Sequence, residues 1–489
     1  MRQDASHPPT YALARWLFLR LIGLSYLAAL VSLWPQLGGL YGPRGILPVE
    51  HFLRMVAQRF GPERYWQLPT LCWLHPTVGF LHVLCAAGTC LAVLLIFDVA
   101  PAAALVGLWA AYLSLVTVGH EFLAFQWDNL LLEAGFLAIF LAPLRLRPRV
   151  TGDAPPSRLA LWLLWWLLFR LMFSSGVVKL ASGDATWRHL TALTYHYETQ
   201  PLPTWIGWYA HQLPAWFQRL SCVLMFCIEL IVPWFIVGPR RWRRAACAVL
   251  IGFQLLIAAT GNYCFFNLLT IALCVLLLDD DAWPRRWRER CTEAPAARGR
   301  WPAWIIGPMA ALIMLLSSAT LPGLRGVWRW LPSPLMAAPR WAAPFRTVNG
   351  YGLFAVMTTT RNEIVIEGSR DGIEWKPYAF KYKPGDPARR PAFVAPHQPR
   401  LDWQMWFAVL GSYRENPWFL EFCGRLLQGS PEVLALLATN PFPDRPPAYI
   451  RAVVYEYHFT DPATRRWQGT WWQRELRGLY CPALSLSAS

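Results

Sequence analysis

Long apolar runs recur through the first two-thirds of the chain, and they constrain its fold more than any other feature. A helix that crosses about 30 Å of hydrocarbon needs about 20 apolar residues, because the bilayer offers no water to satisfy the backbone. Of the 489 residues, 55% are hydrophobic and only 15% are charged, against about 25% in ordinary soluble domains. We therefore predict a polytopic α-helical membrane domain with about nine spans. The predicted spans cover residues 16–34, 78–97, 102–119, 128–143, 159–181, 217–237, 245–260, 263–278 and 304–321.

Arginines that cluster in short loops between the apolar runs supply much of the formal net charge of +16. Three such loops cover 145–158, 240–244 and 285–300, and the predicted span order places all three on the side of the N-terminus. Short basic loops are typical of the cytoplasmic side of a membrane. We therefore predict a cytoplasmic N-terminus, an extracytoplasmic C-terminal domain and no nucleic-acid partner. The loop 35–77 falls on the outer side, and its four arginines count mildly against this topology.

The composition changes after Pro322, where the chain becomes typical of a soluble domain. We divide the sequence into a multi-span membrane domain (1–321), a linker rich in Pro, Trp and Arg (322–346) and an extracytoplasmic domain (347–489). The C-terminal domain is large enough to bury its own hydrophobic core.

Two periodic patterns, one of strands and one of helices, predict the fold of the C-terminal domain. Apolar and polar residues alternate with the period of a strand at 363–367, 375–382, 449–459 and 471–479. Helical spacing occurs at 402–410, 418–427 and 433–437. We therefore expect a β-rich, sandwich-like domain with a helical insert.

Two cations interrupt the apolar run 159–181, with Arg170 near its centre and Lys179 near its outer end. A charge inside a bilayer is costly, so it usually faces the bundle interior, finds a partner and marks a functional site. The spacing between the two places them on roughly opposite faces of a helix, so one buried partner cannot serve both. Lys179 either extends toward the interface or, if desolvated, acts as a base.

Acidic and amide side chains in other spans are candidate partners for these cations. With Arg170 they form a predicted intramembrane polar network of Asp128, Asn129, Glu133 and Glu229. One interpretation is a set of buried ion pairs that fixes helix register, and the other is a polar cavity that opens outward. Asn129 and Glu133 share a helix face, while Asp128 can cap the start of its helix.

The outer loop that follows the Lys179 span is crowded with aromatic and ionisable residues. The predicted client- or ligand-binding residues are Trp187, His189, Tyr195, His196, Tyr197, Glu198, His211 and Gln212. Trp and Tyr are typical of membrane interfaces, and Trp, Tyr and Arg also concentrate the energy of protein interfaces. Anchoring at the membrane surface and binding of an exported client are therefore both open interpretations. The histidine spacing matches no ligand pattern, so no metal site is predicted.

Several long motifs resemble those of the lipase maturation factor family. They include Ser-Ser-Gly-Val-Val-Lys-Leu at 174–180, Tyr-His-Tyr-Glu-Thr-Gln-Pro at 195–201 and His-Gln-Leu-Pro at 211–214. Further matches lie at 127–133, 440–442, 449–451 and 455–457, so the resemblance covers most of the chain. It implies a membrane-bound chaperone that assists the folding of secreted lipases or other exported proteins. We expect it to bind and release an incompletely folded client on its outer face.

A short segment supports an alternative. Residues 176–180 with Trp187 also resemble the membrane domain of vitamin K-dependent gamma-carboxylases, which implies an enzyme with Lys179 as catalytic base and a quinone-like lipid as cofactor. Under the main hypothesis no cofactor is predicted, and membrane lipid is a further partner. The chain has no nucleophile elbow, phosphate-binding loop or His-Glu-x-x-His motif, so it is not itself a recognisable lipase.

Arginine dominance and the lack of a retention signal favour a bacterial inner-membrane protein with a periplasmic C-terminal domain. For a eukaryotic source, the expected compartment is the membrane of the endoplasmic reticulum. Most of the 11 cysteines lie in apolar runs and are interpreted as small apolar fillers. Cys423 and Cys481 are candidates for a disulfide in an oxidising compartment.

Overall fold

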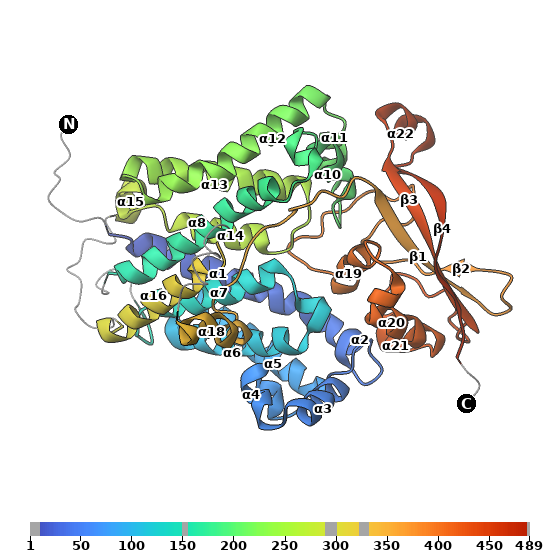
Figure 1. The fold of residues 1–489 in the computed structure, drawn as a ribbon, viewed down its shortest axis with the longest axis horizontal. Helices are drawn as coiled ribbons and strands as arrows, with labels where there is room; N and C mark the ends of the chain where they lie inside the picture. Colours follow the sequence, from blue (N-terminus) through green and yellow to red (C-terminus); the bar gives the residue numbers. More distant parts are fainter. Residues whose placement is uncertain (1–9, 149–154, 289–300, 322–331, 487–489) are drawn as a thin grey trace.

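The computed structural model describes residues 10–148, 155–288, 301–321 and 332–486, and Figure 1 shows their arrangement. Long helices form a bundle, and a sheet with short helices lies at one end of the long axis of the molecule (Figure 1). The helix α15 (Arg285–Arg288), which carries three arginines, lies at the other end (Figure 1). The arginine-rich segment and the sheet thus mark opposite ends of the bundle.

Six helical segments are long and apolar enough to cross a membrane, within the residues that the structure describes. The first, Ala12–Tyr41, combines α1 (Ala12–Leu33), η1 (Trp34–Gln36) and α2 (Leu37–Tyr41). The others are α5 (Val78–Ile96), α6 (Pro101–Val118), α8 (Arg158–Ala181), α12 (Ala215–Leu230) with η5 (Val232–Val237), and α13 (Arg240–Thr260). The N-terminal region is therefore of the multi-pass helical membrane type.

Three further apolar helices correspond to the remaining predicted spans but are shorter. They are α7 (Gln126–Leu141, 16 residues), α14 (Phe266–Val275, 10 residues) and α16 (Ala303–Ser318, 16 residues). At about 1.5 Å per residue, 16 residues extend over only about 24 Å, less than the ~30 Å of a hydrocarbon core. The expected count of nine spans is not confirmed by helix length, and it stays a prediction.

Short helices fill the loops between these segments. Before α5 lie α3 (Val49–Phe60), η2 (Gly61–Glu63), α4 (Arg64–Gln67) and η3 (Leu71–Trp73), and η4 (His120–Leu123) follows α6. Between α8 and α12 lie α9 (Ala185–Arg188), α10 (Leu193–Thr199) and α11 (Trp205–His211). After α14 come η6 (Asp280–Ala282) and α15, and α18 (Ser333–Ala342) with η8 (Ala343–Phe345) precedes the sheet. The predicted linker 322–346 falls partly on residues 322–331, which lie outside the described residues.

Local sequence signals explain where the long helices begin and how closely they pack. The hydroxyl of Ser157 accepts a hydrogen bond from the backbone N–H of Ala160 at 3.4 Å and so caps the start of α8. Gly135 on α7 lies against the hydroxyl of Tyr26 on α1, and a Cβ at this position would overlap that oxygen. Glycine is therefore required for the close approach of α7 to α1.

The C-terminal region contains one antiparallel sheet of four strands in the order β2-β1-β3-β4. Its strands are β1 (Arg361–Ser369), β2 (Lys376–Pro377), β3 (Tyr449–Phe459) and β4 (Trp472–Leu484). In the central pair, Arg361 lies opposite Tyr457 and Ser369 lies opposite Tyr449. The described residues hold no second sheet, so the sandwich is not confirmed.

A helical insert lies between β2 and β3, as the spacing predicted. It contains α19 (Arg400–Ala408), η9 (Tyr413–Glu415), α20 (Pro417–Leu427) and α21 (Pro431–Leu434), and α22 (Pro462–Gln468) connects β3 to β4. The predicted return strand 375–382 is mostly wrong, because only Lys376 and Pro377 of it pair with β1. Cys423 and Cys481 are both buried free thiols, so the considered disulfide is not formed.

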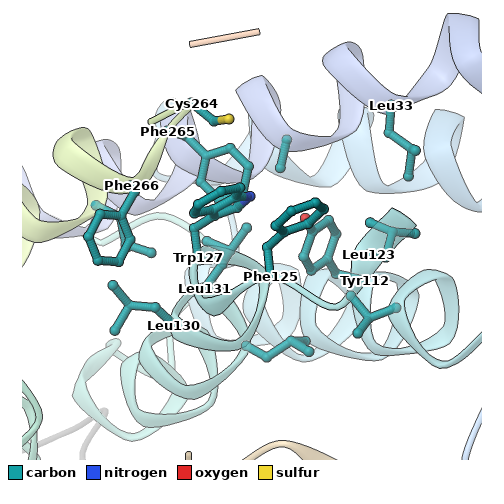
Figure 2. Packing of buried hydrophobic residues seen from close by; sticks show 14 of the residues in the cluster. Leu33, Tyr112, Leu123, Phe125, Trp127, Leu130, Leu131, Cys264, Phe265 and Phe266 are labelled. Carbon is teal, nitrogen blue, oxygen red and sulfur yellow. The ribbon is translucent and has the colours of Figure 1, made fainter. Parts of the chain in front are cut away.

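A single large core joins the helix bundle to the C-terminal region. Figure 2 shows Phe125 and Trp127 side by side within this cluster, and their rings stack with centroids 4.8 Å apart. Trp403 of α19 packs against Trp127 edge to face at 4.7 Å. The indole N–H of Trp127 donates to the side-chain oxygen of Gln398 at 2.8 Å. The C-terminal region is thus packed into the end of the bundle.

Candidate functional site

The first element of the candidate site is an ion pair between Glu133 of α7 and Arg170 of α8, both buried. The second carboxylate oxygen of Glu133 accepts from the backbone N–H of Asn349 at 2.8 Å and from the hydroxyl of Tyr351 at 2.7 Å. Arg170 also donates to the carbonyl of Asn349 at 3.1 Å. Since a buried carboxylate needs its full set of partners, the segment that precedes the sheet completes this polar pair.

A second ion pair lies a turn away on α7. Arg400, at the start of α19, donates through both terminal nitrogens to Asp128, at 2.7 and 2.9 Å. The hydroxyl of Tyr112 donates to the same carboxylate at 2.5 Å. Two parallel hydrogen bonds between a guanidinium and a carboxylate are the strongest form of ion pair in proteins. Asp128 was expected as a candidate helix cap and as a member of the polar network; it makes no cap hydrogen bond at the start of α7 and acts through this ion pair.

Asn129, the remaining α7 residue of the predicted network, takes a smaller part. Its backbone carbonyl accepts from the side-chain amide of Asn349 at 3.3 Å. The residues that complete the network, Arg400 and Asn349, were missed by sequence analysis. They lie 179 or more positions from their partners, and no local signal distinguishes Arg400 from the other arginines.

Lys179 has its own partner, Glu229 of α12. The ammonium nitrogen lies 2.8 and 2.7 Å from the two carboxylate oxygens, and both side chains are buried. It also lies 5.5 Å from the centre of the Trp187 ring. Such contacts hold the side chain in an ion pair that joins α8 to α12. They give no support to base catalysis, and they hold Lys179 inside the protein instead of extending it to the interface.

The loop after α8 is fixed to the segment that leads into the sheet. Trp187 is 2% exposed, and its indole N–H donates to the carbonyl of Phe354 at 2.9 Å. The His196 ring lies 3.3 Å from the hydroxyl of Tyr263. Burial lowers the pKa of His196 to about 4, and the charge of Lys179 acts in the same direction. This histidine is therefore neutral at physiological pH.

Glu198 joins the same loop to β3. Its carboxylate accepts from the backbone N–H of Phe459 at 2.6 Å and lies 3.1 Å from a ring nitrogen of His458. A ring nitrogen of His211 lies 3.8 Å from the Glu198 oxygen that accepts from Phe459. Burial lowers the pKa of His211, and the charge of Glu198 opposes that shift. The side-chain amide of Gln212 donates to the carbonyl of Thr460 at 3.2 Å. These residues form a polar contact between loop and sheet.

Arg361, at the start of β1, completes that contact and was missed by sequence analysis. It is buried and donates to three backbone carbonyls of the loop, those of Glu198 at 2.7 Å, Gln200 at 2.5 Å and Pro201 at 3.1 Å. Glu363 pairs with it at 2.6 Å. The end of α10 is thereby anchored to the sheet, because its free carbonyls find their donors there.

The predicted client-binding residues therefore divide into two groups. Trp187, His196, Glu198, His211 and Gln212 contact other parts of the protein, as described above. In contrast, His189 and Tyr195 are exposed, and Tyr197 is partly so. His189 and Tyr195 are thus the most available to a partner, while His196, His211 and Gln212 are partly exposed like Tyr197. Within the described residues, no group of three or more His, Cys, Asp or Glu side chains is placed to hold a metal ion.

Comparison with known proteins connects these features to a family. The family model for the lipase maturation factor transmembrane domain matches residues 13–285, and that for the lipase maturation factor C-terminal domain matches residues 347–482. Lipase maturation factor 2 of Mus musculus is 38% identical over 586 residues, which cover 96% of this chain and 83% of that protein. Lipase maturation factor 1 of Homo sapiens is 35% identical over 510 residues, which cover 98% and 89%.

No solved structure matches this chain. The relatives named above are eukaryotic, so they do not support the expected bacterial inner membrane or a periplasmic orientation. Both family models match, and the identity extends over nearly the whole chain, including the helices and segments that carry the buried ion pairs. The chain belongs to the lipase maturation factor family.

Proposed function

We propose that this protein is a membrane-anchored maturation factor that assists the folding of secreted lipases or other exported proteins. The observation that carries the proposal is the 35–38% identity to lipase maturation factors 1 and 2 across both the helical and the C-terminal regions. The structure adds a physical basis, because the buried Arg400–Asp128 ion pair and the hydrogen bonds of Asn349 and Tyr351 to Glu133 fix the C-terminal region to the helix bundle.

The proposed topology has nine spans, a cytosolic N-terminus and an extracytoplasmic C-terminal region. Two observations support it. The arginines of α15 lie at the end of the bundle opposite the sheet (Figure 1), and short basic segments favour the cytosolic side. Arg240 and Arg244 pair with Asp279, near α15, so a second arginine-rich segment belongs to the same end.

The proposed mechanism is binding and release of a client without a nucleotide. The exposed side chains of His189 and Tyr195 lie on the loop that Arg361 and Glu198 attach to the sheet. A loop that is already ordered loses little conformational entropy when a partner binds. The buried members of the same loop act by positioning these surface residues.

The test is a complementation experiment. Eukaryotic cells that lack their own lipase maturation factors would express this protein together with a secreted lipase, and lipase activity in the medium would be measured. We expect the wild-type protein to restore activity. A protein that reaches the membrane at normal levels and restores none would refute the proposal.

A further inference from the structure

A cleft of about 710 Å³ lies between the first outer loop and the helical insert of the C-terminal region. Its walls come from the loop before α3 and α3 itself, from η4, and from α20. The two sides are held together next to the cleft, because the hydroxyl of Ser430 donates to the carbonyl of Arg44 at 2.7 Å. The cleft is therefore a fixed feature of the junction.

The inner surface of the cleft is apolar. Leu47, Phe52 and Val78 line it with partly exposed side chains. Behind them Ile46 and Val49 are buried, and Trp418 of α20 packs against Phe122 with ring centres 5.4 Å apart. Met55 of α3 also lines the cleft but is 49% exposed. Surfaces of this kind suit aliphatic or aromatic side chains, since they remove apolar area from water without requiring polar partners.

The rim of the cleft carries three carboxylates: Glu50 on α3, Glu121 on η4 and Glu421 on α20. None of them forms an ion pair or side-chain hydrogen bond with any residue that the structure describes. They differ in this from several buried carboxylates of the chain, which are paired. Unpaired carboxylates around an apolar floor are complementary to a ligand that is both basic and apolar.

His120 lies between the floor and the rim. Its φ of +45° is rare for a residue other than glycine, and its ring packs edge to face with Phe52, with ring centroids 3.8 Å apart. Burial lowers its pKa, while Glu121 opposes the shift. Its imidazole is therefore neutral at physiological pH, and its ring nitrogens have no hydrogen-bond partner among the described residues. It leaves the acidic character of the rim unchanged and adds a hydrogen-bonding group beside the apolar floor.

We propose that this cleft binds an extended segment of polypeptide in which lysine or arginine alternates with apolar residues. The carboxylates would pair with the basic side chains, and the apolar floor would take the others. Arg54 and Arg425 at the edge offset part of the carboxylate charge but leave the rim net negative, so the rim as a whole disfavours acidic segments. This inference rests on the proposed function, since it identifies where an incompletely folded exported client binds.

The test uses purified full-length protein in detergent and a fluorescent peptide in which lysine alternates with leucine. We expect binding that weakens as salt increases, and a triple variant Glu50→Gln, Glu121→Gln, Glu421→Gln that binds roughly tenfold more weakly. A peptide with glutamate in place of lysine should not bind. The matched control, Glu374→Gln, Asp444→Asn, Glu475→Gln, removes the same charge from exposed positions that do not line the cleft and should bind as the wild type does.

A photo-crosslinking amino acid at Met55 localises the ligand, with Ile373, which is 81% exposed and does not line the cleft, as the control position. Crosslinking of the peptide at Met55 alone supports the inference. Adducts with lipid alone at Met55, equal crosslinking at both positions, or unchanged binding by the triple variant would each overturn it. The proposed function is judged separately, by lipase secretion in the complementation assay. If the wild type and the triple variant restore secretion equally well, the cleft is excluded as the client site and the proposed function still holds.

Discussion

Arg400 and Asp128 lie 272 positions apart in the sequence and form a two-point ion pair in which both side chains are buried. Asp128 begins a helix of the membrane region, and Arg400 begins the first helix of the C-terminal insert. The contact therefore connects the two halves of the protein through their most costly groups. Neither residue can be removed without leaving a buried charge unpaired.

Replacing Arg400 with Met should destabilise the protein by about 3 to 5 kcal/mol, because the Asp128 carboxylate stays buried without its partner. Thermal unfolding in detergent measures this change. The control is Arg44→Met, which removes an exposed pair with Glu432 and should cost about 1 kcal/mol or less. The double variant Asp128→Asn, Arg400→Met should be more stable than Arg400→Met alone. Equal losses for Arg44→Met and Arg400→Met would contradict this account.

Substitutions of Lys179 distinguish a structural role from a chemical one. Lys179→Arg keeps a cation near Glu229, so lipase secretion in the complementation assay should fall little. Lys179→Met leaves Glu229 buried and unpaired, and should reduce both stability and secretion. Adding Glu229→Gln to Lys179→Met should recover part of the stability. A correctly folded Lys179→Arg protein without any activity would show that the amine itself is needed.

The stability of the protein should fall as the pH drops below about 6.5. His196 has a pKa lowered from 6.5 to about 4 by burial, so the unfolded chain takes up a proton at a pH where the folded chain does not. The contribution of neutral His196 to the free energy of unfolding is complete above pH 6.5 and is lost as the pH falls. The loss amounts to about 3 kcal/mol by pH 4. Unfolding measured across this range should therefore show a decline in stability on acidification.

The variant His196→Gln should make that decline shallower. His211 and His397 also have pKa values lowered by burial, so part of the acid sensitivity should persist. His189→Gln changes an exposed histidine and serves as the control. If both variants followed the wild-type pH profile, His196 would not be the group responsible.

Packing between α7 and α1 should be intolerant of a single methyl group. Gly135→Ala places a Cβ against the Tyr26 hydroxyl, which donates to the carbonyl of Leu131 at 3.2 Å, and should cost about 1 to 3 kcal/mol. Gly252→Ala on α13 is the matched control, since nothing lies within 4 Å of its added Cβ. That variant should be neutral or slightly stabilising because alanine favours helices. A Gly135→Ala protein as stable as the wild type would show that the helices can separate at little cost.

Local pattern was sufficient to predict much of the fold. The Leu- and Trp-rich run of α8 and the alternation of β3 carry their structure in neighbouring residues, and both lie close to where the sequence placed them. The strand predicted after Gly372 was mostly wrong, because most of its aromatic residues pack against other elements without pairing in the sheet. Alternation shows that a strand can form, but pairing depends on the remote neighbour.

The candidate site was only partly accessible to sequence reasoning. The cost of burying Arg170, Lys179 and Glu133 was enough to mark them as candidates. Their partners were harder to identify, because any of 45 basic and 29 acidic residues satisfies the same requirement of charge. Arg361 and Arg400 become recognisable only when the fold brings them to the loop and to α7.

The late position of Arg400 has a consequence for biosynthesis. When synthesis has reached the end of α8, the chain already contains the carboxylates of Asp128 and Glu133. The donors Asn349 and Arg400 have not yet been synthesised. The polar pairs of the bundle therefore remain incomplete until the C-terminal region has been made. A premature stop codon after residue 321 would therefore yield an insertion-competent fragment that membrane quality control recognises and degrades.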